Sequence, residues 1–141
     1  MRIVVAVNPE ADEPWVVDAV IDLARQTGAS ASVVAVDEVE LERLASVPRA
    51  IYAERAEQAA SAAVRRLTEA GIDATATVLP GRPVERILEF ADTDRADLIV
   101  AGSSSKPAVA QKLLGSVPLT LIRRSERPVL VVTHPHRAAQ P

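Results

Sequence analysis

The chain has 141 residues, a length that fits one domain with its own hydrophobic core. Its formal net charge of −3 gives no field that would attract nucleic acid or an anionic membrane, and the absence of cysteine excludes disulfides, thiolate metal sites and thiol nucleophiles. We find no signal peptide and no apolar run close to the roughly 20 residues that span a bilayer, so we expect a cytoplasmic protein.

Five short apolar runs predict strands. Four of them are nearly continuous and rich in β-branched residues, which is typical of strands buried on both faces of a parallel sheet. These four runs cover residues 3–7, 32–36, 98–101 and 129–132. The fifth run, residues 74–79, alternates small polar with apolar residues, and this pattern favours an edge strand.

Four segments between these runs predict helices, at residues 14–27, 49–70, 83–92 and 116–124. Pro14 suits a first helical turn, and Gly28 is a typical residue after a helix end. Ser116 is expected to be the N-cap of the last helix, with Pro118 in its first turn. Residues 38–48 form a charged connection that is partly helical by its composition.

The alternation of strands and helices predicts a doubly wound five-stranded parallel sheet with helices on both faces, a Rossmann-like α/β fold. We expect one domain over residues 1–134 and a short tail over residues 135–141. If the third strand is an edge, the first strand lies beside the fourth at the centre. Ligands bind beyond the carboxyl ends of such central strands, so the loops after Val7 and Ala101 are expected to form the site.

The segment "AGSSSKPAVAQKLLGSV", residues 101–117, carries the residue types of a phosphate-binding loop. Gly102 permits close backbone approach, and Gly115 and Ser116 begin a helix whose N–H groups can bind an anion. Three serine hydroxyls and two lysines, Lys106 and Lys112, add donors and positive charge. The alternative is that Gly102 is an ordinary turn and Ser116 an ordinary N-cap, and the residues alone leave both interpretations open.

The chain resembles the universal stress protein family from Arg2 to Thr133. The matching pieces are "RIVVAV", "GRPVERILEFADTDRADLIVAGS" and "LLGSVPLTLIRRSERPVLVV". Nucleotide-binding members carry glycine, two residues, glycine, nine residues, and glycine with serine or threonine. This chain keeps that register but has Ser105 in place of the middle glycine, and it has Asn8 where those members usually have aspartate.

The resemblance implies a fold like that of the adenine nucleotide alpha hydrolases and a site for ATP or a related adenine nucleotide, which magnesium could accompany. It also implies a homodimer that forms through the last strand, residues 129–132. The sequence itself favours the same dimer, because an apolar strand at an open sheet edge needs a partner to cover it. The residues implied at the nucleotide site are Asn8, Ala35, Ala101, Gly102, Ser104, Ser105, Gly115, Ser116 and Val117.

The sequence gives little sign of catalysis. No serine has a histidine base nearby in sequence, no carboxylate pair declares itself by spacing, and "NPEADE" after the first strand lacks the Ser-Gly-Gly of the related nucleotide-cleaving proteins. His134 and His136 read as a solvated tail rather than a metal pair, and Trp15 as a packing residue. The acidic residues Glu10, Asp12 and Glu13 read as a solvated loop before a helix, although they could help to place magnesium through water.

Two classes of function therefore remain. The favoured one is a regulatory module of the stress response that binds an adenine nucleotide, weakly because of Ser105 and Asn8, and is not an enzyme. The other is a dimer of the same family that binds no nucleotide and acts by contacting a partner protein. A slow hydrolase is a distant third.

Overall fold

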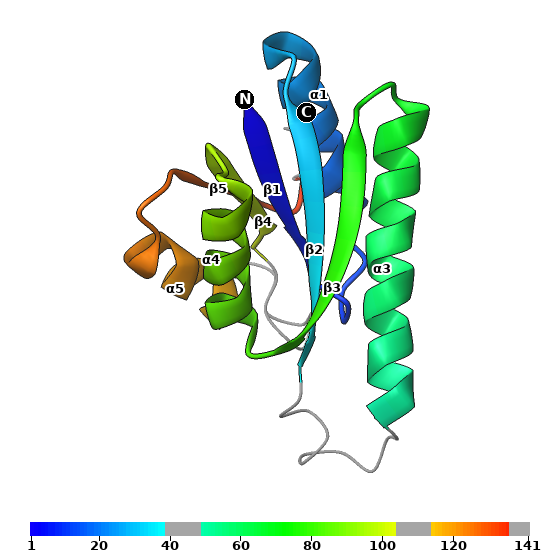
Figure 1. The fold of residues 1–141 in the computed structure, drawn as a ribbon, viewed down its shortest axis with the longest axis vertical. Helices are drawn as coiled ribbons and strands as arrows, with labels where there is room; N and C mark the ends of the chain where they lie inside the picture. The colour runs from blue at the N-terminus through cyan, green and yellow to red at the C-terminus, as the bar shows by residue number, and fades with distance from the viewer. Residues whose placement is uncertain (39–48, 104–113, 136–141) are drawn as a thin grey trace, which may run out of the picture.

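The computed structural model describes residues 1–38, 49–103 and 114–135 of the chain (Figure 1). Its centre is a five-stranded sheet with the order β3-β2-β1-β4-β5, in which every neighbouring pair is parallel. The predicted fold class is confirmed, as are β3 at an edge and β1 beside β4. The strands are β1 Arg2–Val7, β2 Ser30–Glu38, β3 Ala74–Gly81, β4 Leu98–Gly102 and β5 Val129–Val132.

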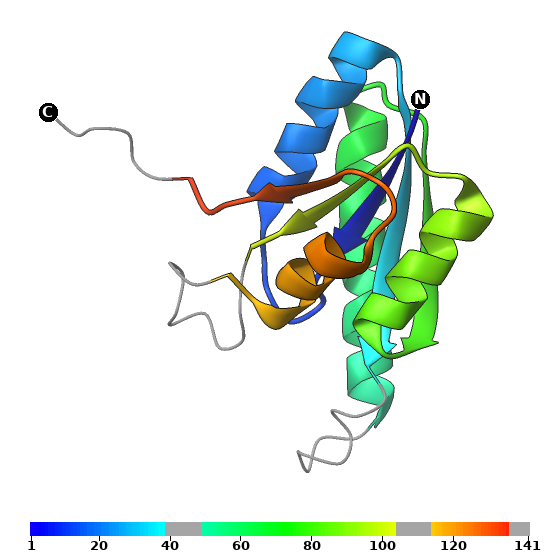
Figure 2. The same ribbon diagram turned by 90° about the vertical axis from the view of Figure 1, so that its left-hand side faces the viewer.

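Helices cover both faces of the sheet, two on each face (Figures 1 and 2). The first pair packs on one face and the second pair on the other, which is the doubly wound arrangement. The first pair is α1 Pro14–Thr27 and α3 Arg49–Glu69, and the second is α4 Pro83–Asp94 and α5 Ser116–Arg124. No helix in the described ranges is long and apolar enough to cross a membrane.

Two aliphatic cores lie on either side of the sheet. Successive β1 side chains alternate between them, so Ile3 and Val5 pack against α1 and α3 while Val4 packs against α4 and α5. Leu67 of α3 and Leu121 of α5 are fully buried in their respective layers. Burial on both faces explains why the central strands read as continuous apolar runs.

The predicted bounds of α1, α5 and β5 agree with the structure. β2 is longer than predicted because it has a partner on each side: Ser30 pairs with Arg2 at one end and Glu38 pairs with Gly81 at the other. Residues 39–48, which make up nearly all of the predicted charged connection, lie outside the described residues.

The prediction that Ser116 is the N-cap of α5 is wrong by one residue. Gly115 is the N-cap, with φ −65° and ψ 161°, and no side chain caps the helix. The N–H of Gly115 donates to the carbonyl of Ser103 over 3.0 Å, and its own carbonyl accepts from Leu119. This link to the end of β4 fixes the helix start one residue earlier and makes Ser116 the first helical residue.

Candidate functional site

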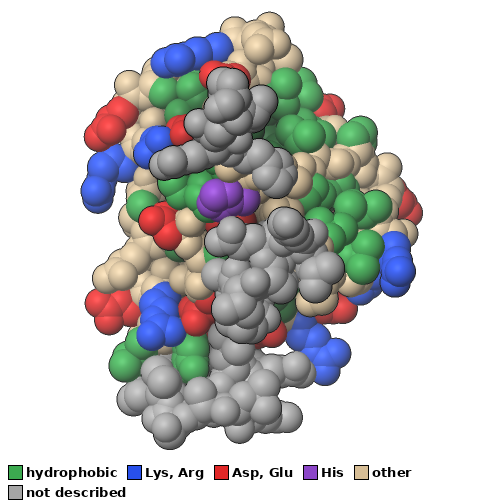
Figure 3. All heavy atoms as spheres, turned by 180° about the vertical axis from the view of Figure 1, so that it is seen from behind, with side chains coloured by type: hydrophobic (Ala, Val, Ile, Leu, Met, Phe, Trp, Pro, Cys, Tyr) green, Lys and Arg blue, Asp and Glu red, His purple; other side chains and the backbone are tan. Residues whose placement is uncertain are grey.

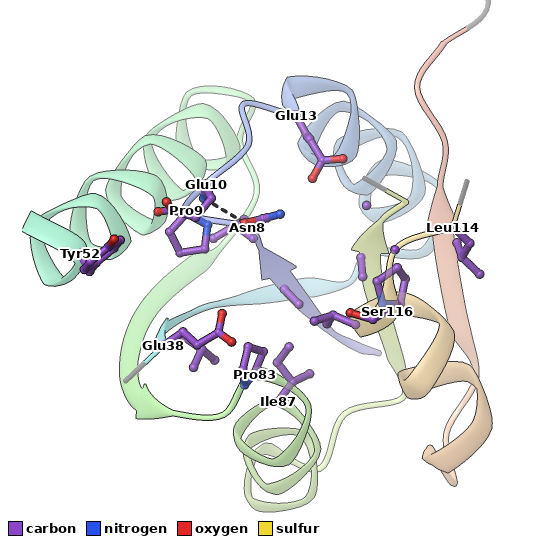
Figure 4. A pocket seen from close by; sticks show the side chains of 18 residues that line it. Asn8, Pro9, Glu10, Glu13, Glu38, Tyr52, Pro83, Ile87, Leu114 and Ser116 are labelled. Atoms are coloured by element: carbon purple, nitrogen blue, oxygen red, sulfur yellow. Dashed lines mark hydrogen bonds between the residues drawn. The ribbon is translucent and has the colours of Figure 1, made fainter. Parts of the chain in front are cut away.

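A cavity of about 480 Å³ opens at the carboxyl ends of the central strands (Figure 4). It lies beside β1 and β4, which are neighbours in the sheet. The chain continues from β1 into a helix on one face of the sheet and from β4 into a helix on the other face. Open α/β sheets bind ligands at such a point, where the winding direction reverses. Its volume is within the usual range of small-molecule sites. The lining residues are Ala6, Val7, Asn8, Pro9, Glu10, Glu13, Val36, Glu38, Tyr52, Pro83, Ile87, Ala101, Gly102, Leu114, Gly115, Ser116, Val117 and Pro118.

Most of the residues expected at the nucleotide site line this cavity: Asn8, Ala101, Gly102, Gly115, Ser116 and Val117. Ala35 does not, because it is fully buried in the core layer under α1 and α3. The alternation of β2 gives the cavity the next residue, Val36, instead. Ser104 and Ser105, with the lysines Lys106 and Lys112, lie outside the described residues.

The N-terminus of α5 faces the cavity without a side-chain cap. Gly115, Ser116 and Val117 all line the cavity, and within the described ranges no side chain makes a capping hydrogen bond at this helix start. The first N–H groups of a helix have no partner within the helix, and the helix dipole places partial positive charge there. This end of α5 therefore offers backbone donors to an anion in the cavity.

The loop after β1 is shaped by Asn8. Its Oδ1 accepts a hydrogen bond from the N–H of Glu10 over 2.9 Å, and its carbonyl accepts from the N–H of Ala11 over 3.3 Å. Because Oδ1 is used in this way, the Nδ2 donors remain for other partners, and Figure 4 shows the amide nitrogen turned away from Glu10. The carboxylate of Glu10 in turn pairs with Arg55 of α3 over 3.0 Å.

The charged part of the lining is acidic. Glu10, Glu13 and Glu38 line the cavity, and no lysine or arginine does so in the described part of the chain. The interpretation of Glu10 and Glu13 as a solvated loop therefore needs correction, since both are half-buried at the cavity wall. Periodicity and capping rules could not have found this, because the wall forms only when β1, β4 and α5 come together.

Glu13 also explains the glycine at the end of β4. A Cβ atom built on Gly102 would lie 2.5 Å from Oε2 and 2.6 Å from Oε1 of Glu13. Any side chain larger than hydrogen would collide with that carboxylate. Gly102 thus permits a close approach, as predicted, but in this structure the group that approaches is a carboxylate of the same chain.

The C-terminal segment contacts α1 outside the cavity. The ring of His134 lies edge-on to Trp15, with ring centroids 4.5 Å apart and an interplanar angle of 65°. His134 is exposed, while Trp15 is half-buried against the core and packs as predicted. The contact itself was not expected from a solvated tail. Among the described residues, no three His, Cys, Asp or Glu side chains form a group that could hold a metal ion.

Comparisons with known proteins agree with this architecture. The universal stress protein of Archaeoglobus fulgidus in complex with dAMP superposes with a TM-score of 0.73 at 25% identity, over 94% of this chain and 98% of that one. A universal stress protein in complex with cAMP superposes with a TM-score of 0.69 at 26% identity, over 94% and 95% of the two chains.

In sequence, a universal stress protein of Methanocaldococcus jannaschii is 36% identical over 84 residues, which are 60% of this chain and 49% of the relative. The chain thus spans about half the length of the curated relatives it matches. The model of the universal stress protein family matches residues 1–133. The chain therefore belongs to the universal stress protein family.

Proposed function

We propose that this chain is a regulatory module of the stress response that binds ATP or another adenine nucleotide in the cavity between β1 and β4. It acts in the cytoplasm as a dimer and is not an enzyme. The observation that carries the proposal is the uncapped N-terminus of α5, which meets Gly102 at the wall of one cavity. The dAMP and cAMP complexes of the two structural relatives support the choice of an adenine nucleotide.

The lining divides in a way that suits a nucleotide. Val36, Ile87 and Pro83 offer an apolar wall for the base, at the β2 and α4 side of the cavity. The N–H groups at Ser116 and Val117 would bind phosphate at the neighbouring start of α5. In Figure 4 Asn8 lies across the cavity from Pro83 and Ile87, and its Nδ2 donors would bind a ribose oxygen.

Magnesium is not required by this proposal. The sequence left magnesium open as a companion of the nucleotide, and the described residues bring together no group of three metal-holding side chains. A magnesium ion that accompanies a nucleotide would be held mainly by the phosphates and water, so it needs no such set. The binding argument rests on backbone donors and on the apolar wall alone.

The dimer would form through β5. On the side away from β4, no strand of the described chain pairs with β5, and its Leu130 side chain is 40% exposed. Further apolar side chains, Leu119 and Ile122 of α5, are also exposed, and Figure 3 shows hydrophobic side chains gathered where α5 and β5 lie. Pairing of β5 with the same strand of a second copy would cover this edge.

Native mass spectrometry tests the binding proposal directly. Protein purified without added nucleotide should be dimeric and should either carry an adenine nucleotide or take one up when ATP, ADP, AMP or cAMP is added. Gly115→Leu should abolish uptake because its side chain would fill the cavity wall, whereas Gly115→Ala should keep the fold, since a φ of −65° suits any residue. Unchanged uptake by a folded Gly115→Leu variant would place the site elsewhere.

A regulatory role also predicts very slow chemistry. We expect ATP turnover far below the usual enzyme range of about 1–1000 per second, measured as phosphate release. Turnover within that range that co-purifies with the folded protein and responds to mutation of Gly115 would contradict the proposal.

The second candidate is a dimer that contacts a partner protein and binds no nucleotide. The acidic cavity wall and the substitution at Ser105 favour this candidate. It would be preferred if the native chain and the Ser105→Gly variant both failed to bind at millimolar ATP.

A further inference from the structure

The side of the cavity away from α5 is formed by Tyr52 of α3. In Figure 4 Tyr52 and Ser116 lie on opposite sides of the cavity, with Pro83 and Ile87 between them. The topology agrees with this view, because α3 packs over β2 and β3 while α5 follows β4, on the other side of β1. A ligand whose phosphate binds at the start of α5 would therefore extend across the apolar wall toward Tyr52.

Two contacts hold the Tyr52 ring in position. The guanidinium carbon of Arg55, three residues later on α3, lies 5.5 Å from the ring centroid, an arrangement in which the cation attracts the ring. Arg55 is itself held by Glu10, whose Oε1 accepts a hydrogen bond from Nη1 over 3.0 Å. The ring is thus tied to the loop after β1. A side chain that is already fixed loses little conformational entropy when a ligand contacts it.

Tyrosine offers a ligand an aromatic ring and a hydroxyl group that both donates and accepts hydrogen bonds. Arg55 lies over the ring and only 7% of Tyr52 is exposed, so the cavity receives a narrow part of this side chain. Such a part suits an edge-on contact with a flat base, one of the arrangements that aromatic pairs prefer. A purine is joined to its sugar through the five-membered ring, so its far edge lies farther from the sugar than that of a pyrimidine.

We propose that Tyr52 is a specificity-determining residue that contacts the six-membered ring of a purine and makes the cavity prefer purine over pyrimidine nucleotides. The inference rests on the proposed function, because it concerns the same cavity, and it assigns the end of that cavity that binds the base. With the phosphate at Ser116 and Val117, a purine reaches Tyr52 across the apolar wall, and a pyrimidine stops short of it.

Calorimetric titration of the full chain with AMP, CMP and ribose 5-phosphate tests the inference. The native chain should bind AMP about tenfold more tightly than CMP, as one aromatic contact with a hydrogen bond would produce. Tyr52→Leu removes the ring and should weaken AMP binding about tenfold and CMP binding less than about threefold. Ribose 5-phosphate has no base, and its affinity should change less than about twofold. Tyr52→Phe keeps the ring and should keep the preference for AMP within about threefold of the native value.

Phe90→Leu is the matched control. It makes the same kind of aromatic-to-leucine change, but Phe90 lies on α4, packs against the core and does not line this cavity. The ratio of AMP to CMP affinity should therefore stay within about twofold of the native ratio. Melting temperatures of the variants near that of the native chain establish that each one is folded.

Nuclear magnetic resonance tests the contact in the unaltered protein. Tyr52 is the only tyrosine of the chain, so its ring protons give a single set of signals. AMP should shift these signals, because the ring current of a base in contact acts on nearby protons. Ribose 5-phosphate should leave them in place, although it would bind the same start of α5.

The outcomes separate the two proposals. If AMP binds but the Tyr52 signals stay in place, or Tyr52→Leu keeps the native ratio of AMP to CMP affinity, the role of Tyr52 is overturned and the nucleotide site stands. A loss of the AMP preference in Phe90→Leu overturns it as well, because the effect would then come from general loosening of the fold. If none of the three ligands binds the native chain at millimolar concentration, the proposed function fails and the inference with it.

Discussion

At the scale of single residues, glycine is required at position 102 because the Glu13 side chain, which comes from the start of α1, packs against it. Three glycines of the described chain, at positions 28, 71 and 81, have positive φ, and neither Gly102 nor Gly115 is among them. Glycine is needed at position 102 because Glu13 approaches it, while Gly115 lies buried at the cavity wall with a φ of −65° that other residues also adopt. The usual argument that glycine supplies a left-handed backbone therefore does not apply at these two positions.

Ser105 is the position at which that argument still matters. It takes the place of a glycine in the pattern of nucleotide-binding relatives and lies outside the described residues. If its backbone must be left-handed, serine there costs roughly 1–2 kcal/mol, or about tenfold in affinity. We expect Ser105→Gly to tighten ATP binding by about that factor in calorimetry. Ser104→Gly is the control, and equal effects of the two variants would argue against a special conformation at position 105.

Asn8 should contribute to stability through the loop after β1. Its Oδ1 accepts the N–H of Glu10, and a lost hydrogen bond of this kind costs about 1 kcal/mol. We expect Asn8→Ala to lower the free energy of unfolding in urea by about that amount. Asn8→Asp keeps the acceptor and should lose less than half as much. If the aspartate variant is as unstable as the alanine variant, the amide donors and not Oδ1 hold the loop.

At the scale of helices and strands, the direction of α5 decides where its N-terminal donors lie. α5 is held at its start by the hydrogen bond from Gly115 to Ser103 and at its end by the ion pair of Arg124 with Glu85 of α4, at 3.0 Å. Its buried side is small, with Pro118 and Leu121 inside and Leu119 and Ile122 exposed. The buried Leu121 and the hydrogen bond from Gly115 to Ser103 therefore set the orientation of the helix, and the exposed ion pair adds little to it.

The ion pair at the end of α5 makes a pH-dependent prediction. The hydrogen bond from Arg124 lowers the pKa of Glu85, and the Arg124 and Arg82 charges act in the same direction. A lowered carboxyl pKa adds stability above the ordinary value, and that stability is lost as the pH falls through the lowered pKa. The gain is small because the pair is exposed.

Arg124→Ala should accordingly raise the pKa of Glu85 toward its ordinary value, which a carboxyl NMR titration can follow. Arg123→Ala removes the neighbouring charge, which makes no ion pair with Glu85 in the structure, and should leave that pKa unchanged. An unchanged pKa of Glu85 in Arg124→Ala would mean that the pair does not persist in solution.

The helices and strands were largely predictable because each has a local signal. Pro14 and Gly28 bracket α1, and the β-branched run of β5 has the predicted bounds, since capping and burial act within a few residues. The site was only partly predictable. Spacing pointed to Gly102 and Gly115, but it could not reveal that Glu13 lies over Gly102 or that His134 contacts Trp15, because these contacts form between residues far apart in sequence.

At the scale of the whole molecule, the two edges of the sheet differ in chemistry. β3 carries alanine and threonine in its first half and Pro80 near its end, and small polar residues and proline both discourage pairing with another strand. β5 is the short run "VLVV", with no charge and no proline, and Leu130 is exposed on it. Of the two edges, β5 is therefore the one suited to a second copy of the chain.

Leu130→Lys tests this assembly. In a two-fold pairing of β5 with itself, residue 130 lies close to its copy, so two lysines would repel each other there. A charged side chain on an edge strand also discourages pairing with another strand. We expect sedimentation velocity to find a dimer for the native chain at micromolar concentration and a monomer for Leu130→Lys. Ile51→Lys is the control, because Ile51 is similarly exposed, at 39%, but lies on α3 away from β5. That variant should remain dimeric. A native chain that sediments as a monomer, or a Leu130→Lys variant that stays dimeric, would rule out β5 as the interface.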